Sequence, residues 1–197
     1  MELTPSVSLL LRGKSEQTCR MNPPELFETN RLNLRRPVME DAEAIFVQYA
    51  QDPEVTRYLT WRPSQNIEET RAHLRVCDAG WNQGKTFQWA IIRKNDNQLL
   101  GGISFRVDGH KLELGYVLAK AYWNMGYMTE AVTQVIDWAL KQENVYRVWA
   151  VCDIENEASA CVLEKAGMQR EGILHRWTMH PNRSDEPRDC FCYAITK

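Results

Sequence analysis

The residues whose types and spacing best suit chemistry lie in the stretch 112–138. Its pattern predicts a strand, a turn with one glycine and a helix. The strand is apolar and β-prone apart from Glu113 and Gly115, as expected of a largely buried strand. Gly126 then precedes Thr129, a residue type that favours a helix N-cap, and apolar residues at helical spacing. A glycine turn that opens a helix presents free backbone N–H groups at the positive helix end. The pattern therefore predicts an anion site, most often one for phosphate.

A second polar pair, Asn156 and Ser159, follows the next predicted strand, residues 146–152. Taken alone, this pair indicates a helix start, because Asn156 is a favoured N-cap and Ser159 can complete a capping arrangement. The acid–base candidate is Glu113, the only carboxylate within its strand. The alternative for Glu113 is a solvated or ion-paired strand residue. Neither a Gly-x-Gly-x-x-Gly nor a Gly-Lys-Ser/Thr motif is present at the glycine turn, so dinucleotide and nucleoside triphosphate sites find no support there.

The glycine turn resembles a known coenzyme loop. Residues 123–128, Trp-Asn-Met-Gly-Tyr-Met, are similar to the pyrophosphate loop of the GNAT acetyltransferases, written Gln/Arg-x-x-Gly-x-Gly/Ala. Tyr122-Trp123, the lone Gly126 and the following Tyr-Met-Thr-Glu-Ala resemble the branch of ribosomal-protein alanine N-acetyltransferases, the Rim-type branch. The chain departs from the motif at both ends, with Trp123 at the Gln/Arg position and Met128 at the second Gly/Ala position.

Two further segments carry the same resemblance. Residues 156–168 resemble the Asn-x-x-Ser…Glu-Lys-x-Gly-Phe motif of that branch, and residues 29–35 resemble its opening strand. The resemblance covers residues 26–195. It implies an acetyl-CoA-dependent N-acetyltransferase that acts on a primary amine, either a protein N-terminus such as that of a ribosomal protein, or a small amine. The alternative is a catalytically silent acyl-CoA-binding module that senses a metabolite or recruits a partner.

The resemblance also implies a role for each site residue. Main-chain contacts to the pantetheine and acetyl group are expected from Tyr116, Val117 and Leu118. The pyrophosphate is expected along the loop formed by Trp123, Asn124, Met125, Gly126, Tyr127, Met128 and Thr129. Asn156 is expected to contact the pantetheine arm. Ser159 is expected to hydrogen-bond or protonate the departing thiolate, since no tyrosine stands at the position where superfamily members often carry one.

Acetyl transfer to an amine needs a base for the ammonium group, a donor for the oxyanion and a proton for the thiolate. The family supplies the oxyanion donor from backbone N–H groups where the fourth strand bulges and splays from the fifth. Glu113 is the expected base, although it lies on the opposite strand face from Tyr116 unless a bulge changes that parity. The alternatives are a water chain to bulk solvent and four reserve candidates near the groove, Glu171, His175, Asp185 and Asp189. A covalent route through Cys152 or Cys161 is disfavoured, because Cys161 has no histidine nearby in the sequence to lower its pKa.

The order of predicted elements is β-α-α-α-β-β-β-α-β-α-β-β, which indicates an α/β (α+β) fold. The sheet is expected to be mixed, mostly antiparallel with one parallel pair and flanked by helices. The resemblance implies the GNAT acyl-CoA N-acyltransferase fold, with about seven strands and with strands four and five splayed. Residues 26–36 are expected to form the first strand. Residues 1–22 are expected to be a flexible extension, and residues 23–197 a single N-acetyltransferase domain.

Composition limits the function classes. Of the 197 residues, 44% are hydrophobic and 25% charged, as in an ordinary soluble protein, and the formal net charge of −2 argues against general affinity for nucleic acid. No apolar run is long enough to span a membrane. The six cysteines show no CxxC pattern and no metal-ligand pairing with the histidines. We therefore expect a cytoplasmic protein without a metal, and the resemblance implies a monomer or homodimer.

Overall fold

The computed structural model describes residues 21–197, which are organised around one mixed sheet of eight strands in the order β1-β2-β3-β4-β5-β6-β8-β7. The strands are β1 (Leu26–Glu28), β2 (Leu32–Arg35), β3 (Thr86–Arg93), β4 (Leu99–Asp108), β5 (Lys111–Leu118), β6 (Arg147–Asp153), β7 (Gln169–Thr178) and β8 (Arg188–Thr196). Neighbouring strands are antiparallel except β5 and β6, which are parallel. The predicted sheet with one parallel pair is thereby confirmed. Residues 1–20 of the expected N-terminal extension lie outside the described residues.

The sheet has one strand more than expected, because residues 26–36 form a hairpin and not a single strand. The backbone N–H of Thr29 donates to the carbonyl oxygen of Leu32 at 2.9 Å. The Thr29 side chain accepts a hydrogen bond from the Leu32 N–H at the same distance. These two bonds reverse the chain between β1 and β2 and place Phe27 opposite Leu34. The alternation of apolar and polar residues that predicted one strand over residues 26–36 therefore corresponds to β2 alone.

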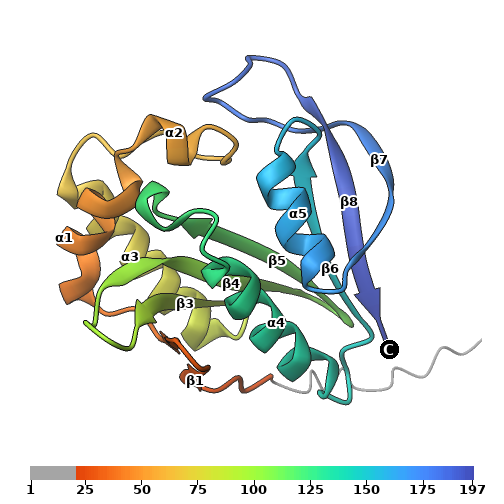
Figure 1. Ribbon diagram of the computed structural model, residues 1–197, viewed down its shortest axis with the longest axis horizontal. Helices are drawn as coiled ribbons and strands as arrows, with labels where there is room; N and C mark the ends of the chain where they lie inside the picture. The colour runs from red at the N-terminus through yellow and green to blue at the C-terminus, as the bar shows by residue number, and fades with distance from the viewer. Residues whose placement is uncertain (1–20) are drawn as a thin grey trace, which may run out of the picture.

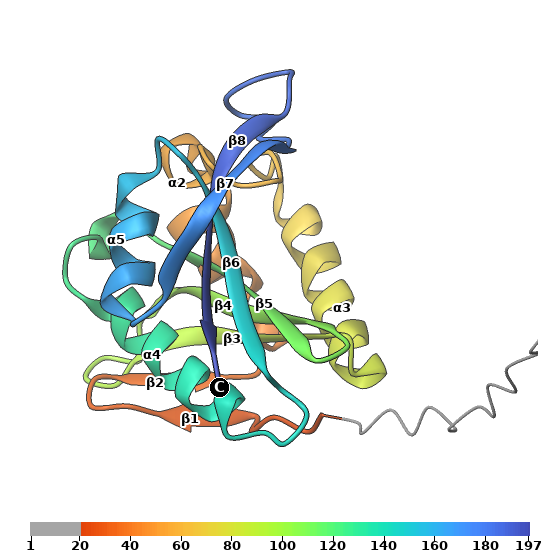
Figure 2. The ribbon, with the colours of Figure 1, turned by 90° about the vertical axis from the view of Figure 1, so that its right-hand side faces the viewer.

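Among the described residues, five α-helices flank the sheet: α1 (Ala42–Ile45), α2 (Pro53–Thr56), α3 (Ile67–Gln83), α4 (Tyr127–Leu140) and α5 (Glu157–Lys165). Helices α4 and α5 lie on one face and α1 and α3 on the other, as the two views in Figures 1 and 2 show. Helix α1 belongs to a longer helical segment that starts with a 3₁₀ turn (Met39–Asp41) and ends with a π-helical turn (Phe46–Ala50). Helix α3 begins where the Asn66 side chain accepts a hydrogen bond from the Glu69 N–H.

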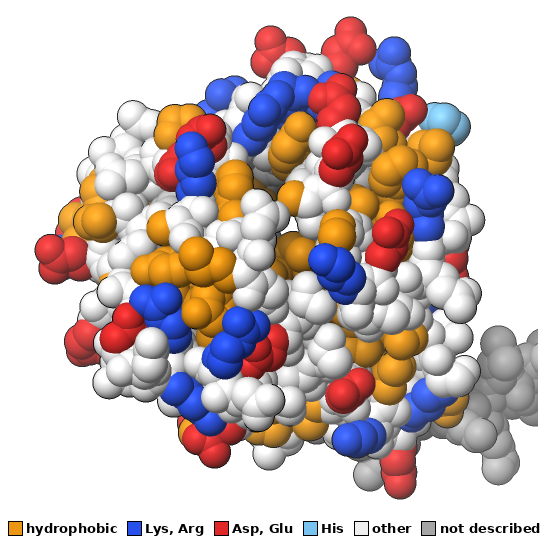
Figure 3. Space-filling view, viewed as in Figure 1, with side chains coloured by type: hydrophobic (Ala, Val, Ile, Leu, Met, Phe, Trp, Pro, Cys, Tyr) orange, Lys and Arg blue, Asp and Glu red, His pale blue; other side chains and the backbone are white. Residues whose placement is uncertain are grey.

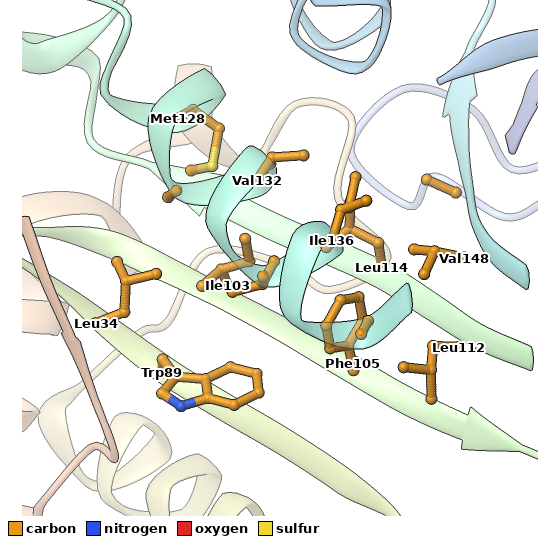
Figure 4. Close-up of a cluster of buried hydrophobic side chains, with 14 of the residues drawn as sticks. Leu34, Trp89, Ile103, Phe105, Leu112, Leu114, Met128, Val132, Ile136 and Val148 are labelled. Carbon is orange, nitrogen blue, oxygen red and sulfur yellow. The ribbon is translucent and has the colours of Figure 1, made fainter. Parts of the chain in front are cut away.

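Helix α4 covers the centre of the sheet with its apolar side. Its buried residues recur at helical spacing and are Met128, Ala131, Val132, Val135, Ile136 and Ala139. Figure 4 shows Val132 and Ile136 packed over Ile103 and Phe105 of β4. Full burial of each such aliphatic side chain contributes about 1.5–3 kcal/mol, so the helix is firmly held. The glycine turn that precedes α4 is thereby fixed over the sheet.

Strands β5 and β6 pair over three residues and then separate. The paired positions are Lys111, Leu112 and Glu113 opposite Arg147, Val148 and Trp149. Beyond them, β5 stays paired with β4 as far as Leu118, and β6 stays paired with β8 as far as Asp153. We call the opening between residues 114–118 and residues 150–153 the splay. Figure 1 shows the start of α4 and the helix α5 on the two sides of this opening.

Candidate active site

The backbone of β5 faces the splay at alternate residues. The Ala119 N–H donates to the Leu100 carbonyl oxygen at 2.8 Å, so the alternation of an antiparallel pair directs the main chain of Val117 toward β4. A Cβ added to Gly101 would collide with the Val117 carbonyl oxygen, which agrees with this direction. The main chain of Tyr116 therefore faces the splay. The expectation of a main-chain contact from Val117 does not fit, because its backbone groups are directed at β4.

Leu118 also faces the splay, but its carbonyl oxygen is occupied. The Trp123 indole Nε1 donates to it at 2.8 Å, while the Trp123 side chain remains 39% exposed. Trp123 thus ties the loop before α4 to the end of β5. Of its main-chain groups, Leu118 has its N–H left to offer to a ligand in the splay.

The loop before α4 has the backbone of an anion site. Gly126 is the N-cap of α4 with φ of 77°, and Asn124 is also left-handed with φ of 60°. Left-handed residues in such a turn direct successive N–H groups to one concave side. Among the described residues no side chain caps α4, so the N–H groups of Tyr127, Met128 and Thr129 have no helical acceptor. Thr129 is the third helical residue and not an N-cap, because Gly126 takes that position.

The two methionines of this loop differ in exposure. The Met125 side chain is 52% exposed, whereas Met128 is 4% exposed and packs in the core. Met128 can therefore contribute its main chain only. The start of α4 therefore combines a left-handed turn, free N–H groups and a buried side chain at Met128 that anchors the loop. We call the concave main-chain surface formed here the cradle.

Two hydroxyl groups meet beside the splay. The Tyr116 phenol oxygen lies 2.7 Å from Ser159 Oγ, and it also donates to the Ser159 carbonyl oxygen at 3.2 Å. Tyr116 comes from β5 and Ser159 from the first turn of α5, so side chains bridge the opening that the main chains leave. In Figure 3 this face is hollowed near its centre, between α4 and α5, with apolar side chains in the hollow. Tyr116 was expected to contribute its main chain only, so the role of its phenol is a finding of the structure.

Burial keeps this cluster protonated. Burial raises the pKa of Tyr116 above its ordinary value of 10, and the hydrogen bond with Ser159 offsets only part of that rise. Burial also raises the pKa of Cys152, which is hydrogen-bonded to Ser159, to about 12. At neutral pH the cluster therefore offers uncharged O–H and S–H donors. Because a thiol is nucleophilic as the thiolate, a covalent route through Cys152 is not supported.

Asn156 has the capping role that the sequence left open. Its side-chain oxygen accepts from the Ser159 N–H at 3.2 Å and fixes the start of α5. The Asn156 Nδ2 group has no hydrogen-bond partner among residues 21–197. The residue can therefore cap the helix and still donate to a ligand.

Glu113 lies on the opposite face of the sheet from Tyr116. The β4–β5 register runs from Gly101 opposite Leu118 to the hairpin without a shift, so the expected bulge in β5 is absent and the parity of the strand is kept. The Glu113 carboxylate pairs with Arg106, its cross-strand neighbour, and its side chain is 23% exposed. Glu113 is also the last β5 residue paired with β6 before the splay. The structure thus brings Tyr116 and Ser159 together and keeps Glu113 apart from them.

Two loops join beyond the end of β6. The Asn182 side chain donates to the carbonyl oxygens of Thr56 and Trp61, both at 2.7 Å. We call residues 56–61 together with residues 179–187 the roof. Arg183 pairs with Glu155, the second residue after β6, and so connects the roof to the end of the splay.

A buried charged group supports the roof. Asp153, 1% exposed, accepts hydrogen bonds from Arg188 and from the Glu155 N–H. Burial alone would raise the pKa of Asp153, but these bonds hold it below its ordinary value. His180, 4% exposed, lies 3.8 Å from the Asp153 carboxylate, and burial lowers the pKa of this imidazole. A charged carboxylate and a neutral imidazole therefore lie under the roof at neutral pH.

In the described part of the chain, no three or more His, Cys, Asp or Glu side chains are grouped as metal ligands. No helix among residues 21–197 combines the length and apolar content needed to cross a membrane.

Comparisons with known proteins agree with this geometry. Residues 31–169 match the family model described as an acetyltransferase (GNAT) domain. The uncharacterized N-acetyltransferase YoaA of Bacillus subtilis (strain 168) is 33% identical over 175 residues, which cover 87% of this chain and 97% of YoaA.

Solved structures of acetyltransferases have the same fold. A GNAT-family acetyltransferase from Bacillus anthracis superposes with a TM-score of 0.76 at 29% identity, over 87% of this chain and 98% of that one. RimL, a ribosomal L7/L12 alpha-N-protein acetyltransferase in complex with coenzyme A, shares the fold with a TM-score of 0.79 at 20% identity, over 87% and 98%. The chain belongs to the GNAT family of acetyltransferases and is an N-acetyltransferase.

Proposed function

We propose that the protein transfers the acetyl group of acetyl-CoA directly to a primary amine in a ternary complex. The observation that carries this proposal is the splay itself, which has the hydroxyl pair of Tyr116 and Ser159 on one face of the sheet and the carboxylate of Glu113 on the other. Such an arrangement separates the group that meets the leaving thiolate from the group that meets the amine.

On the donor side, the free N–H groups at the start of α4 would hold the pyrophosphate of acetyl-CoA. The pantetheine arm would then run between α4 and α5 into the splay, where the Asn156 amide and the main chain of Tyr116 can donate and accept hydrogen bonds. The residues fit this ligand because the cradle, the unpaired strand edge and the free amide lie along one face.

On the acceptor side, the amine would approach from the face that carries Glu113. Glu113, or a water molecule, removes a proton from the ammonium group, and the amine attacks the thioester carbonyl carbon. The N–H groups of β5 that face the splay stabilise the negative oxygen. When the carbon–sulfur bond breaks, the attacking nitrogen loses its remaining excess proton and the thiolate takes one up. The Ser159 hydroxyl, held by Tyr116, hydrogen-bonds to the departing sulfur during this step.

We further propose that the acceptor is a protein N-terminus or a small amine selected mainly by shape. Charged side chains at the edge of the roof have partners of opposite charge, as Arg183 has in Glu155 and, beside the roof, Arg188 has in Asp153. Figure 3 shows basic and acidic side chains interspersed on this face. Paired charges give no strong field of one sign, so a polycationic acceptor such as a polyamine is less favoured.

The cellular setting follows from the same chemistry. All five cysteines in the described part of the chain are free, as expected in a reducing compartment. We propose that the enzyme works in the cytoplasm, as a monomer or homodimer.

The decisive experiment measures thiol release from acetyl-CoA with a panel of N-terminal peptides, small monoamines, polyamines and aminoglycosides, next to a calorimetric titration with coenzyme A. Turnover with one class identifies the acceptor. Coenzyme binding without turnover on any amine would favour the silent acyl-CoA-binding module. Absence of coenzyme binding would refute the proposed donor.

A further inference from the structure

A guanidinium group lies along the loop before α4. Arg31, in the turn between β1 and β2, donates from Nη1 to the Met125 carbonyl oxygen at 3.0 Å. Its guanidinium carbon lies 4.4 Å from the centre of the Tyr127 ring. A Cβ added to Gly126 would lie 3.5 Å from Arg31 Nη2. Arg31 therefore lies close to three successive residues of the loop, Met125, Gly126 and Tyr127.

Glu130, in the first turn of α4, holds the other edge of the guanidinium. Its carboxylate accepts from Arg31 Nε at 2.6 Å, from the Arg31 backbone N–H at 3.0 Å and from the Thr29 hydroxyl at 2.6 Å. Burial by itself would raise the pKa of Glu130, but these donors hold it below its ordinary value. The carboxylate is therefore charged at neutral pH, and it fixes the plane of the guanidinium.

The remaining nitrogen is available to a ligand. Arg31 Nη2 has no hydrogen-bond partner among the described residues, and the Arg31 side chain is 46% exposed. A guanidinium matches phosphate oxygens in geometry as well as in charge. Glu130 compensates the charge of Arg31 only in part, so Nη2 offers a phosphate a directed hydrogen bond together with a local positive charge.

We propose that Arg31 binds a phosphate of the coenzyme through Nη2, with Glu130 and Thr29 as its positioning residues. This inference rests on the proposed acetyl-CoA site. The loop itself carries Trp123 at the position where the family motif has Gln or Arg, so it lacks a polar side chain there. Arg31 supplies such a side chain from the β1–β2 hairpin.

The test compares calorimetric titrations of coenzyme A into the full-length wild type, Arg31→Gln and Arg71→Gln. Arg71 is a matched control, since its side chain is 43% exposed and paired with an acidic residue on the outer side of α3. We expect Arg31→Gln to weaken coenzyme A binding about tenfold, as the loss of one charge-assisted hydrogen bond does. Arg71→Gln should bind as the wild type does.

A second variant separates a phosphate contact from support of the loop. Thr29→Val keeps the guanidinium but removes the hydrogen bond to Glu130 and the one that the Leu32 N–H donates to Thr29, so it weakens the support of Arg31 alone. It should weaken binding about twofold and keep the wild-type dependence on salt between low and high ionic strength, whereas Arg31→Gln should flatten that dependence. Equal losses and equal salt dependence in both variants would show that Arg31 only supports the loop, which overturns the inference.

The remaining outcomes are also decisive. Wild-type affinity in Arg31→Gln would refute the phosphate contact while leaving the proposed acetyl-CoA site intact. Failure of the wild type itself to bind coenzyme A would refute both. Circular dichroism melting of each variant verifies that a loss of binding is not a loss of folding.

Discussion

The proposed donor side and the proposed acceptor side of the splay are built by different means. On the donor side, backbone N–H groups at the start of α4 and a buried, uncharged hydroxyl pair form the site. On the acceptor side, charged side chains pair with groups of opposite charge, as Glu113 does with Arg106 and Arg183 of the roof does with Glu155. Backbone groups and buried hydroxyls are fixed by the fold, whereas exposed ion pairs contribute little to stability and can be exchanged. We infer that the donor site tolerates little change and that the acceptor side can be altered without loss of the fold.

The largest expected effect concerns the donor side. Gly126→Glu places a side chain where φ is 77° and a negative charge where phosphate is proposed to bind. We expect coenzyme A affinity to fall by at least about a hundredfold in calorimetry.

Gly109→Glu is the matched control for this variant. Gly109 also has positive φ, of 58°, but a Cβ there meets nothing within 4 Å. Both variants bear a comparable backbone cost of about 1–2 kcal/mol, yet only Gly126→Glu should lose the coenzyme. Normal binding by Gly126→Glu would contradict the loop assignment.

The second largest effect is expected from a substitution on the acceptor side. Glu113→Gln removes the proposed base, and we expect kcat to fall about a hundredfold, with loss of the acidic limb of its pH profile. Glu171→Gln is the control, since Glu171 is also paired with an arginine of the sheet, Arg147 of β6. If Glu171→Gln loses activity instead, Glu171 is the base, and if neither variant does, water fills that role.

A smaller effect is expected from the hydroxyl pair. Tyr116→Phe and Ser159→Ala should each lower kcat about tenfold, and coenzyme A affinity should change less than twofold, because both groups act on the leaving thiolate. The double variant should be no slower than the slower single variant, since the two hydroxyls act as one unit.

Tyr193→Phe provides the control for this pair, because it removes another buried phenol, one that donates to Glu164 at 2.8 Å. It should turn over normally. Additive losses in the Tyr116→Phe, Ser159→Ala double variant would separate the roles of the two hydroxyls.

The smallest effect concerns stability under the roof. The pKa of His180 is lowered by burial from 6.5, so below about pH 6.5 the unfolded chain takes up a proton that the folded chain does not. Stability should therefore decrease as the pH falls below this value. Urea midpoints at pH 7.5 and 5.5 measure the decrease, which should be smaller in His180→Gln.

His73, whose pKa is lowered mainly by burial as well, contributes in the same direction, so the slope will not vanish in that variant. If the pH dependence of stability is unchanged in His180→Gln, His180 does not contribute to it.

The sequence predicted the main-chain parts of the site better than the side-chain parts. Gly126 and Asn156 were identified because a left-handed turn and a helix cap restrict the residue types that fit. The phenol of Tyr116 was missed, although the alternation of β5 places it on the same face as Leu112 and Leu114. Its partner Ser159 is 43 residues away, and no local pattern records a contact at that separation.

The sequence by itself determined the order of elements after the first hairpin, a sheet with one parallel pair, and the glycine turn that opens α4. These features follow from local periodicity and from residues such as Gly126, whose backbone conformation other residues adopt only at a cost. Tertiary structure alone decided that residues 26–36 form a hairpin, that β5 carries no bulge and that Arg31 reaches the start of α4. Each of these features depends on contacts between segments that are distant in the sequence. The free energy of such contacts cannot be derived from one short stretch of residues.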